Sequence, residues 1–555
     1  MNSFALKPWI VFYLLPFLGG ILYPLGFPMK SFPHFMGLSF LGVFLFLQAL
    51  PIRMPAIENK SLTHQSTFSI NIISSLLFSL GYCLVGYYWI PYTLTEFGDI
   101  PFPLNQLLGT LFSLIIVPQL ILFVVVINLW RRLEFQRSSL ADGFATRNII
   151  YSLVLVLLES FTPQQFPAHL GHTWLQLSPF LGLSSIFGVQ IYSFFSYWLI
   201  LSFISLWHIK RVDKFGVISF TLFLGINIIS PLPPTPQISK EPSQNVNLRL
   251  VQANVGNFMK LQSETGDPIS MGKIFERYIR LSTQSTQETE KSSSKPDLII
   301  WPETAYPQLL NTAMMRVTPA FVPTVARKTV RQANTFLLFG GYDKSGKENT
   351  HFYETEYNSS FFINPDGTLN DVYHKRLLIP FGESLPFGPL NPILAKVIQN
   401  ISFFAKGQRF PVFKLDKGQS FISIICYEAL FSSFIRDYLN SATTQPQFIV
   451  NLTNDSWYGN TSEPFQHKHL AHWRALEFQM PMVRMTNTGI TSVLYPNGEE
   501  SERLPLFKQG VLDVKVPLKI AKPTIFQKYG ILPFLLLVII LFILAWTTEK
   551  YFKKN

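Results

Sequence analysis

The chain has little charge and almost no cysteine for its length. Only 14% of its 555 residues are charged, whereas roughly 25% is usual in soluble globular proteins. The two cysteines, Cys83 within an apolar run and Cys426 far along the chain in a polar region, exclude a disulfide framework. Together with a hydrophobic fraction of 48%, the shortage of charge excludes an ordinary soluble protein and indicates a membrane protein.

Eight apolar runs are close to or above the length that spans a bilayer, about 20 residues. They are Pro8–Met29, Ser31–Ile52, Thr67–Thr95, Pro101–Trp130, Asn148–Pro163, Phe187–Ile209, Phe215–Ser230 and Gly530–Trp546. The weakest carries Glu159 and precedes an uncharged segment with His169 and His172. No small-residue cleavage site follows the first run, so we expect an anchor rather than a removed signal peptide.

Basic residues set the expected orientation. The net charge of +12 could suggest nucleic-acid binding, but the basic residues lie in short loops rather than on one face, so no nucleic acid is expected as a partner. Every second loop is basic, as at Arg53 and Lys60, at Arg131 and Arg132, and at Lys210. The positive-inside rule therefore predicts cytoplasmic termini and an extracytoplasmic polar region.

This pattern predicts four parts. They are seven membrane helices in 1–230, a proline-rich linker in 231–246, a polar domain in 247–518, and a last membrane helix with a basic cytoplasmic tail in 519–555. In the polar domain, strand-like segments alternate with amphipathic ones, which predicts an α/β fold. The expected strands are Leu248–Val255, Asp297–Trp301, Thr335–Gly341, Ser359–Asn364, Phe421–Cys426, Phe448–Leu452 and Val483–Tyr495, and the expected helices are Met271–Leu281, Ala320–Ala333 and Glu463–Phe478. Asn364–Gly367 and Pro496–Gly498 have the composition of hairpin turns.

One stretch, Phe421–Phe431, has the pattern of a nucleophile. A β-prone run leads into Cys426, and Tyr427 and Glu428 follow, which predicts a buried strand that ends in a sharp turn into a helix. At such a turn, backbone N–H groups can face a developing oxyanion. A lone cysteine is, however, more often a small buried hydrophobic residue.

Other candidates for chemistry lie near strand ends. Glu303 follows the apolar run Leu298–Trp301, and Lys375 and Glu383 flank an apolar loop. A thiol needs a base to take its proton and a cation or donor to hold the oxyanion, and these residues could supply both. Taken singly, each is more readily interpreted as an exposed charged residue.

The combination resembles a known family. In chain order, Trp301-Pro302-Glu303, His374-Lys375-Arg376 with Pro380-Phe381-Gly382-Glu383, and Cys426-Tyr427-Glu428 resemble the Glu-Lys-Cys triad of the nitrilase superfamily. Gln252-Ala253-Asn254, the run Asn451–Gly459, and Arg474–Glu477 leading to Pro481, Arg484, Thr486-Asn487 and Gly489 extend the likeness. Together with the apolar runs, they make the chain similar to the apolipoprotein N-acyltransferases over essentially its whole length.

This resemblance implies an α-helical multi-span membrane domain and a four-layer αββα nitrilase-like domain on the periplasmic side of a bacterial inner membrane. The implied acyltransferase moves an acyl chain from a phospholipid, typically phosphatidylethanolamine, through a cysteine thioester to the α-amino group of diacylglyceryl-cysteine in apolipoproteins, the last step of lipoprotein maturation. It implies no cofactor and no metal. Glu303 would be the general base, Lys375 would stabilise the tetrahedral intermediate, and Cys426 would form the thioester.

The resemblance also suggests supporting roles. Glu383 would orient or pair with Lys375, and Tyr427 and Glu428 would shape the site. One departure is Leu261, which stands where the family often has a tryptophan.

Ser384–Phe404 is too apolar for a solvated loop. Its apolar side chains include Leu385, Phe387, Phe403 and Phe404. We expect an arm or amphipathic helix that dips into lipid; the alternative is a helix packed on the core of its own domain.

A metal site is not expected. His467, His469 and His472 occur within six residues of a probable helix, but Lys468 and Arg474 are beside them, and we find no cysteine or carboxylate pair to complete a site.

Two other functions fit part of the pattern. A membrane-anchored nitrilase-type amidase would use the same triad, but one span would suffice to anchor it. A transporter or receptor with a non-catalytic nitrilase-like domain would not need Glu303, Lys375 and Cys426 together.

Overall fold

The computed structural model describes residues 8–50, 64–134, 144–233, 245–285, 295–346, 354–396, 401–519 and 522–554. The chain divides into two compact units. The helical unit comprises Met1–Thr95, Ile100–Pro231 and Tyr529–Asn555, and the sheet unit comprises Leu232–Lys528 with Glu96–Asp99.

The helical unit contains the apolar segments that the sequence predicts. Its elements are η1 (Ile10–Leu14), α1 (Leu15–Leu22), η2 (Tyr23–Gly26), α2 (Met36–Ala49), α3 (His64–Gly86), α4 (Ile90–Gly98), α5 (Leu104–Ile116), α6 (Pro118–Glu134), α7 (Phe144–Phe161), η4 (Leu170–Leu177), α8 (Ser184–Phe187), α9 (Gln190–Ile209), α10 (Lys214–Ile229) and α20 (Leu532–Lys554). Among the described residues, four stretches are long and apolar enough to cross a membrane: Thr67–Gly86, Phe144–Phe161, Gln190–His208 and Leu532–Tyr551. The other four expected runs correspond to shorter apolar helices, Ile10–Gly26, Met36–Ala49, Pro118–Leu129 and Lys214–Ile229.

Two expected runs are divided rather than continuous. The run Pro101–Trp130 forms α5 and α6, and the break falls at Val117, before Pro118. Proline disfavours helical backbone at the residue before it and has no N–H to continue the ladder, which explains the break. The run Thr67–Thr95 forms α3 and α4, separated by a turn after Gly86.

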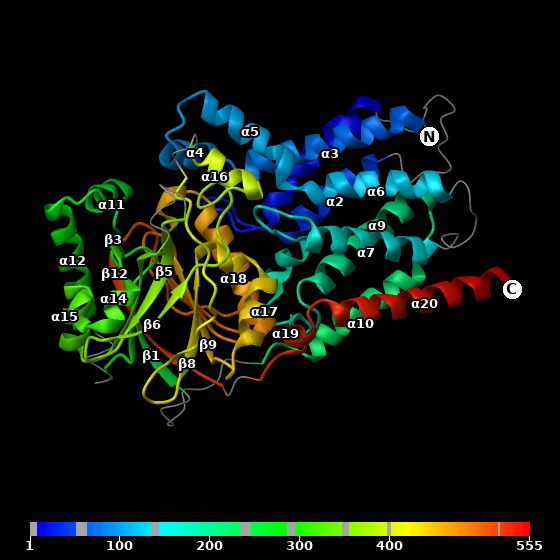
Figure 1. Ribbon diagram of the computed structural model, residues 1–555. Helices are drawn as coiled ribbons and strands as arrows, with labels where there is room; N and C mark the ends of the chain where they lie inside the picture. Colours follow the sequence, from blue (N-terminus) through cyan, green and yellow to red (C-terminus); the bar gives the residue numbers. More distant parts are fainter. Residues whose placement is uncertain are drawn as a thin grey trace. The chain divides into compact units, whose positions relative to one another are not determined.

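The last helix, α20, packs beside α7 although more than 350 residues separate them in the chain (Figure 1). The Glu549 carboxylate accepts hydrogen bonds from the backbone N–H of Ala145 at 2.6 Å and from the hydroxyl of Thr146 at 2.9 Å. Glu159, near the end of α7, is buried and accepts from the Tyr197 hydroxyl at 2.6 Å and from the N–H of Leu170 at 3.0 Å. Both carboxylates therefore have partners inside the helical unit.

Within the described residues, the sheet unit contains two sheets. The first has seven strands in the order β12-β1-β2-β4-β5-β6, with β3 also paired to β4, and the second has five in the order β11-β10-β9-β8-β7. The strands are β1 (Asn245–Gln252), β2 (Leu298–Ile300), β3 (Tyr306–Leu310), β4 (Phe336–Lys344), β5 (Glu356–Ile363), β6 (Leu369–His374), β7 (Phe413–Lys414), β8 (Ser420–Ile425), β9 (Phe448–Thr453), β10 (Met482–Thr486), β11 (Ser492–Leu494) and β12 (Gly510–Pro517).

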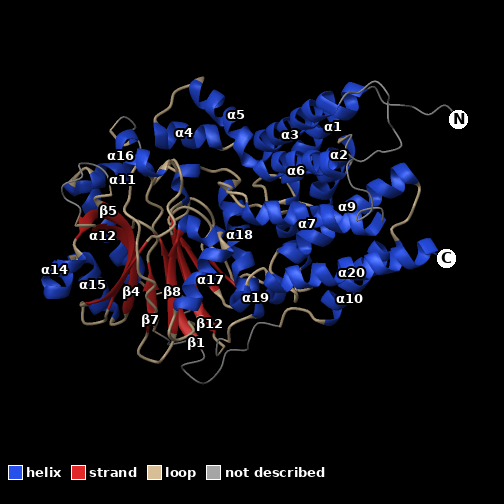
Figure 2. Ribbon diagram, turned by 45° about the vertical axis from the view of Figure 1, so that its right-hand side comes forward, coloured by secondary structure: helices blue, strands red, loops and turns tan. Residues whose placement is uncertain are grey.

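Helices cover the outer faces of the two sheets. Helices α12 (Pro268–Thr283) and α15 (Thr324–Ala333) pack on the first sheet, and α17 (Ser432–Ser441) and α18 (Glu463–Phe478) lie on the side of the second (Figure 2). The remaining helical segments of this unit are α11 (Asn257–Glu264), α14 (Thr312–Val317), η6 (Pro319–Phe321), η7 (Gly388–Leu390), α16 (Asn391–Leu394), η8 (Cys426–Leu430), η9 (Asp455–Tyr458) and α19 (Ile525–Tyr529). The unit is therefore the expected four-layer αββα sandwich.

The inner faces of the sheets are joined by apolar and polar contacts. The rings of Phe362 on β5 and Phe421 on β8 lie edge to face, 5.5 Å apart. Between the same strands, the Ser360 hydroxyl donates to the Ser423 hydroxyl at 2.9 Å. Every residue of β8 and β9 is buried, as the continuous apolar runs of parallel strands predict. The buried parallel pair β8–β9 therefore holds the residues that follow its two strand ends in fixed positions.

The structure corrects some expected boundaries. Val483–Tyr495, expected as one strand, forms two antiparallel strands, β10 and β11, because the chain turns between them. The expected helix Ala320–Ala333 begins only at Thr324, after Pro323. The turns at Asn364–Gly367 and Pro496–Gly498 do join antiparallel neighbours, as expected.

Candidate active site

Cys426 lies at the end of β8, at the first residue of the short helical turn η8. The strand runs parallel to β9 as far as Ile425, and Cys426 then adopts a positive φ of 50°. This left-handed backbone conformation is unfavourable for a residue with a side chain and persists where surrounding contacts impose it. The thiol is buried, as the sequence predicts for a residue at a sharp strand-to-helix turn.

Glu428 fixes this turn. Its Oε2 accepts a hydrogen bond from the N–H of Ile425 at 2.8 Å. Its Oε1 accepts from the N–H groups of Arg376 at 2.7 Å and Leu377 at 3.0 Å, and from the Tyr373 hydroxyl at 2.7 Å. The same carboxylate therefore ties the cysteine turn to the segment that follows β6. Burial raises the pKa of Glu428 to about 6, although these hydrogen bonds favour the charged form.

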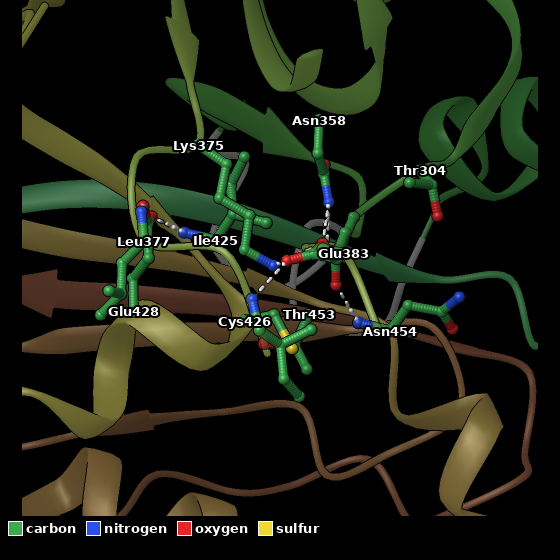
Figure 3. A network of polar contacts seen from close by, with 12 residues as sticks. Thr304, Asn358, Lys375, Leu377, Glu383, Ile425, Cys426, Glu428, Thr453 and Asn454 are labelled. Atoms are coloured by element: carbon green, nitrogen blue, oxygen red, sulfur yellow. Dashed lines mark hydrogen bonds and ion pairs between the residues drawn. The ribbon is translucent and has the colours of Figure 1, made fainter. Parts of the chain in front are cut away.

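Lys375 follows β6, and its ammonium is almost completely buried, at 1% exposure. Its Nζ lies 2.8 Å from Oε1 of Glu383 and 3.6 Å from Oε1 of Glu303. Figure 3 shows the lysine side chain pointing toward Glu383. Burial alone would lower the pKa of Lys375, but the carboxylates of Glu383 and Glu303 outweigh it and raise the pKa. The lysine is therefore a cation in the resting site.

Glu303 is placed by two amide groups that lie far from it in the chain. Its Oε1 accepts from the side-chain amide of Asn358 on β5 at 2.8 Å, and its Oε2 accepts from the backbone N–H of Asn454 at 2.8 Å. The Asn358 amide also donates to Glu383 at 3.1 Å, and Glu383 Oε2 accepts from the N–H of Ile379 at 3.0 Å. Both carboxylates are thus held by donors and are buried.

The electrostatics keep the cysteine protonated at rest. Burial and the negative charge of Glu303 raise the pKa of the Cys426 thiol, and the nearby Lys375 ammonium only partly offsets them. A thiolate is therefore formed only as its proton leaves, and Glu303 is the carboxylate with the largest influence on it. This arrangement fits a base-assisted nucleophile rather than a preformed thiolate.

The structure brings together the side chains that the sequence predicts for this site: Glu303, Lys375, Cys426, Glu383 and Glu428. Tyr427 is also here and is buried, with its ring edge-to-face with that of Phe431 at 4.9 Å.

Three of the four side chains expected to face lipid in this arm are packed inward instead. Leu385, Phe403 and Phe404 are buried, and of the four arm residues only Phe387 is exposed, at 48%. The backbone is pinned to the domain: the N–H of Phe404 donates to the carbonyl of Glu383 at 3.1 Å, and the N–H of Glu354 donates to the carbonyl of Phe403 at 2.8 Å. These bonds turn the two phenylalanines toward the domain interior.

The described part of the arm is also not a long amphipathic helix. It contains only the short turns η7 and α16, which include prolines at 389 and 392. Residues 397–400 of the expected arm lie outside the described residues. The exposed large apolar side chains of the described part of the arm are those of Phe387, Leu390 and Ile393.

Asn358 and Asn454, which donate hydrogen bonds to the carboxylates of Glu303 and Glu383, were not among the predicted site residues. Asn454 could have been found, because it follows the end of β9, and parallel strand ends meet at one edge of a sheet. Asn358 lies inside an antiparallel strand and has no such signal.

The histidines on α18 do not form a common site, but His467 has carboxylate neighbours. Asp455, Glu463 and His467 are all buried, and one ligand-type atom of each lies within 4.8 Å of the others. The expectation that no carboxylate pair lies near the histidines was therefore wrong. Glu463 lies one helical turn before His467 on α18, so the sequence spacing could have predicted this neighbour. Asp455 lies on a different element, η9, and its contact with His467 could not be predicted from spacing.

Comparisons with known proteins cover both units. Residues 19–223 match the apolipoprotein N-acyltransferase N-terminal domain, and residues 269–526 match the carbon-nitrogen hydrolase family. The chain is 30% identical over 477 residues to an apolipoprotein N-acyltransferase of Bdellovibrio bacteriovorus, covering 82% of each chain. It is 27% identical over 532 residues to that of Geobacter metallireducens, covering 93% of this chain and 91% of the relative. The corresponding protein of Rickettsia bellii is 27% identical over 564 residues, or 98% of both chains.

Proposed function

Because the chain belongs to the apolipoprotein N-acyltransferase family, we propose that Glu303, Lys375 and Cys426 carry out the acyl transfer of this family. The enzyme transfers an acyl chain from a membrane phospholipid, through a thioester, to the N-terminal α-amino group of diacylglyceryl-cysteine in apolipoproteins. The observation that carries the assignment of residues is the buried contact of one ammonium with two carboxylates, beside a cysteine at a strand end.

In the first step, the thiol of Cys426 attacks the carbonyl carbon of the phospholipid ester. Its proton passes to the Glu303 carboxylate as the S–C bond forms, and the Lys375 ammonium stabilises the oxyanion of the tetrahedral intermediate. The intermediate collapses, the C–O bond to glycerol breaks, and Glu303 returns its proton to the leaving oxygen. A lysophospholipid departs and the acyl group stays on Cys426.

In the second step, the α-amine of the apolipoprotein attacks the thioester carbonyl. Glu303 accepts a proton from the amine, the C–S bond breaks, and the sulfur of Cys426 regains a proton. The thioester divides a difficult transfer into two easier steps. A buried site also limits hydrolysis of the intermediate by water, and the low exposure of all three residues supports this.

The supporting residues act on this triad. Glu383 holds Lys375 at 2.8 Å and so fixes the ammonium. Glu428 holds the backbone on both sides of the site through Ile425, Arg376 and Leu377. Tyr427 lines the site beside the nucleophile. Of the expected arm, only the exposed side chains around Phe387 are proposed to meet lipid.

Further details rest on the sequence. The alternation of basic loops supports an inner-membrane protein with its catalytic unit on the periplasmic side, and the family resemblance supports phosphatidylethanolamine as donor. Orientation can be tested with Lys273→Cys, an exposed position on α12, in a Cys83→Ala, Cys426→Ala background. An impermeant thiol reagent should label it in spheroplasts before lysis. Labelling only after lysis would reverse the orientation.

The chemistry is tested by incubating the purified protein with phosphatidylethanolamine alone. We expect lysophospholipid release and a hydroxylamine-sensitive acyl group on Cys426, detected by mass spectrometry. The adduct should be absent from Cys426→Ala. Adding a diacylglyceryl-cysteinyl peptide should discharge it to a triacylated product. Ammonia release from a simple amide without an acyl adduct would instead support an amidase.

A further inference from the structure

His467 on α18 lies directly against the backbone of the nucleophile. Its Nε2 is 3.2 Å from the carbonyl oxygen of Cys426, and the imidazole is buried. A second donor, the side-chain amide of Asn451 on β9, reaches the same oxygen at 3.4 Å. The mechanism above uses neither residue. The carbonyl of Cys426 is therefore held from two neighbouring elements in a region that excludes water.

The other nitrogen of His467 faces two carboxylates. Its Nδ1 lies 3.6 Å from Oδ1 of Asp455 and 3.5 Å from Oε1 of Glu463. Arg484 on β10 is also here, with Nη2 2.9 Å from Oδ2 of Asp455 and Nη1 3.0 Å from Oδ1 of Asn451. All four charged or titratable side chains are buried.

Charge balance favours a protonated histidine. Two buried carboxylates beside one guanidinium leave one negative charge without a partner, which is costly in a low-dielectric interior. An imidazolium would complete a set of two positive and two negative groups and could donate from both ring nitrogens. In agreement, Asp455 and Glu463 raise the pKa of His467 against the opposing effects of burial and of Arg484. Burial also raises the pKa of Glu463, but the contact with His467 opposes that rise, and the two carboxylates around Nδ1 favour the proton on the imidazole.

We propose that His467, held as an imidazolium between Asp455 and Glu463, is a positioning residue that orients the Cys426 peptide for catalysis. This inference rests on the acyl transfer proposed above. The carbonyl of Cys426 and the N–H of Tyr427 belong to one planar peptide and point in opposite directions. Fixing the carbonyl toward His467 therefore fixes the direction of the Tyr427 N–H, at the start of η8, where an oxyanion can be stabilised.

The backbone conformation explains why such a clamp is needed. The positive φ of Cys426 is unfavourable for a residue with a side chain, so the turn would relax without contacts that impose it. Glu428 holds the N–H of Ile425, the residue before the cysteine, and His467 with Asn451 holds the carbonyl of the peptide after it. The nucleophile is thus restrained on both sides.

A bound metal ion is the competing explanation for the cluster. Asp455, Glu463 and His467 are close enough to share a cation. However, the Arg484 guanidinium already occupies one oxygen of Asp455 at 2.9 Å and would repel a divalent ion. The structure thus favours a proton on His467 over a metal.

The test compares three variants in single-turnover acylation by phosphatidylethanolamine liposomes. H467L removes the donor, and H467Q retains an amide donor near the position of Nε2 but cannot become a cation. H472Q is the matched control: His472 is buried on the same helix and contacts a backbone carbonyl, that of Tyr495 at 3.3 Å, away from the nucleophile. Thermal unfolding and metal content are measured on each protein.

We expect H467L to slow acylation about 10- to 100-fold, as for loss of a hydrogen bond to a charged group. H467Q should recover most of this rate, with KM for the phospholipid unchanged. In the wild type, the rate should decline at alkaline pH as the imidazolium loses its proton. H467Q should not show this decline. H472Q should match the wild type in rate and in pH profile.

Four results would overturn the inference. Acylation by H467L at the wild-type rate would do so. So would equal slowing in H467L and H467Q with unchanged pH profiles and lowered melting temperatures, which would show a structural role only. Another would be a stoichiometric metal ion whose removal abolishes acylation by the wild type, because the cluster would then hold a metal ion instead of a proton on His467. No adduct even in the wild type would overturn the proposed function itself, and this inference with it.

Discussion

The ammonium of Lys375 lies 2.8 Å from Glu383 but 3.6 Å from Glu303. The lysine thus bonds to Glu383 and not to Glu303, the proposed base. The shorter contacts of Glu303 are with neutral amide groups of Asn358 and Asn454. A base that takes a proton from a thiol should not be fully engaged with a cation, because a close cation lowers its proton affinity. This geometry fits the proposed roles, in which Glu383 holds the cation and Glu303 moves the proton.

Replacing Glu383 tests this division. In Glu383→Gln, Lys375 loses its nearest negative partner and should move toward Glu303, which weakens the base. We expect acylation by phospholipid to fall about 10- to 100-fold, the cost of one hydrogen bond to a charged group. The measurement is the rate of adduct formation at Cys426. The exposed Glu276→Gln on α12 is the control, and equal rates in both variants would contradict the assignment.

The raised pKa of Glu428, about 6, predicts an acid limb in the pH–rate profile. Its carboxylate accepts three backbone N–H groups, so protonation replaces an acceptor with a donor and loosens the nucleophile turn. Acylation should therefore decline as the pH falls through about 6. Glu428→Gln should be slow at every pH and lack this limb, whereas an unchanged limb would assign it to another group.

The raised pKa of Glu428 also predicts that rising pH lowers stability, whereas it increases the acylation rate. Because the pKa of Glu428 in the folded protein lies above the ordinary glutamate value of 4.5, the folded state binds more protons than the unfolded state between these two values. The contribution of Glu428 to stability should thus decrease, by about 2 kcal/mol, as the pH rises through this window. Thermal unfolding at pH 4.5 and pH 7 would show a smaller difference in Glu428→Gln than in the wild type if this is correct.

Gly340 lies against the backbone of Glu303, the proposed base. An added Cβ would meet the N of Thr304 at 2.5 Å and the Cα of Glu303 at 2.6 Å, both of them backbone atoms that cannot rotate away. Gly340→Ala should therefore displace Glu303, lower the melting temperature and reduce acylation at least about 10-fold, since small misplacements of a base are costly. Gly272→Ala on α12, where no atom lies within 4 Å, should be neutral or stabilising by about 0.5–1 kcal/mol. Similar behaviour of the two variants would argue against a steric effect.

The arm offers a contrast between exposed and buried phenylalanines. Phe387→Ser should slow acyl transfer from liposomes and leave the melting temperature unchanged, because this side chain is 48% exposed. Phe404→Ser should instead destabilise the fold by about 3 kcal/mol or more, because its ring is buried and stacks on that of Tyr342 at 5.7 Å. Unchanged turnover in Phe387→Ser would remove the lipid contact from the proposal.

The sequence alone determined where the apolar helices lie and where the proposed nucleophile, Cys426, stands at the end of its strand. The predicted apolar runs form helices of the helical unit. They are visible in the sequence because charged side chains are costly in lipid, so segments that meet lipid contain few of them. The strand leading to Cys426 is equally visible, because a buried parallel strand requires a continuous apolar run. These features depend on local composition, and neighbouring residues in the chain are enough to reveal them.

Only the tertiary structure decided how the charged groups are paired and which side chains face inward. Glu303 meets Asn358 and Asn454 across 55 and 151 positions of sequence, and His467 meets the Cys426 carbonyl across 41. Such contacts follow from strand order and sheet packing, which no local pattern encodes. Apolar composition also failed to separate Phe387 from Phe403 and Phe404, because burial there depends on where backbone hydrogen bonds fix the segment. Hydrophobicity predicts that a side chain leaves water, but the fold decides whether it enters a protein core or stays at a surface that can meet lipid.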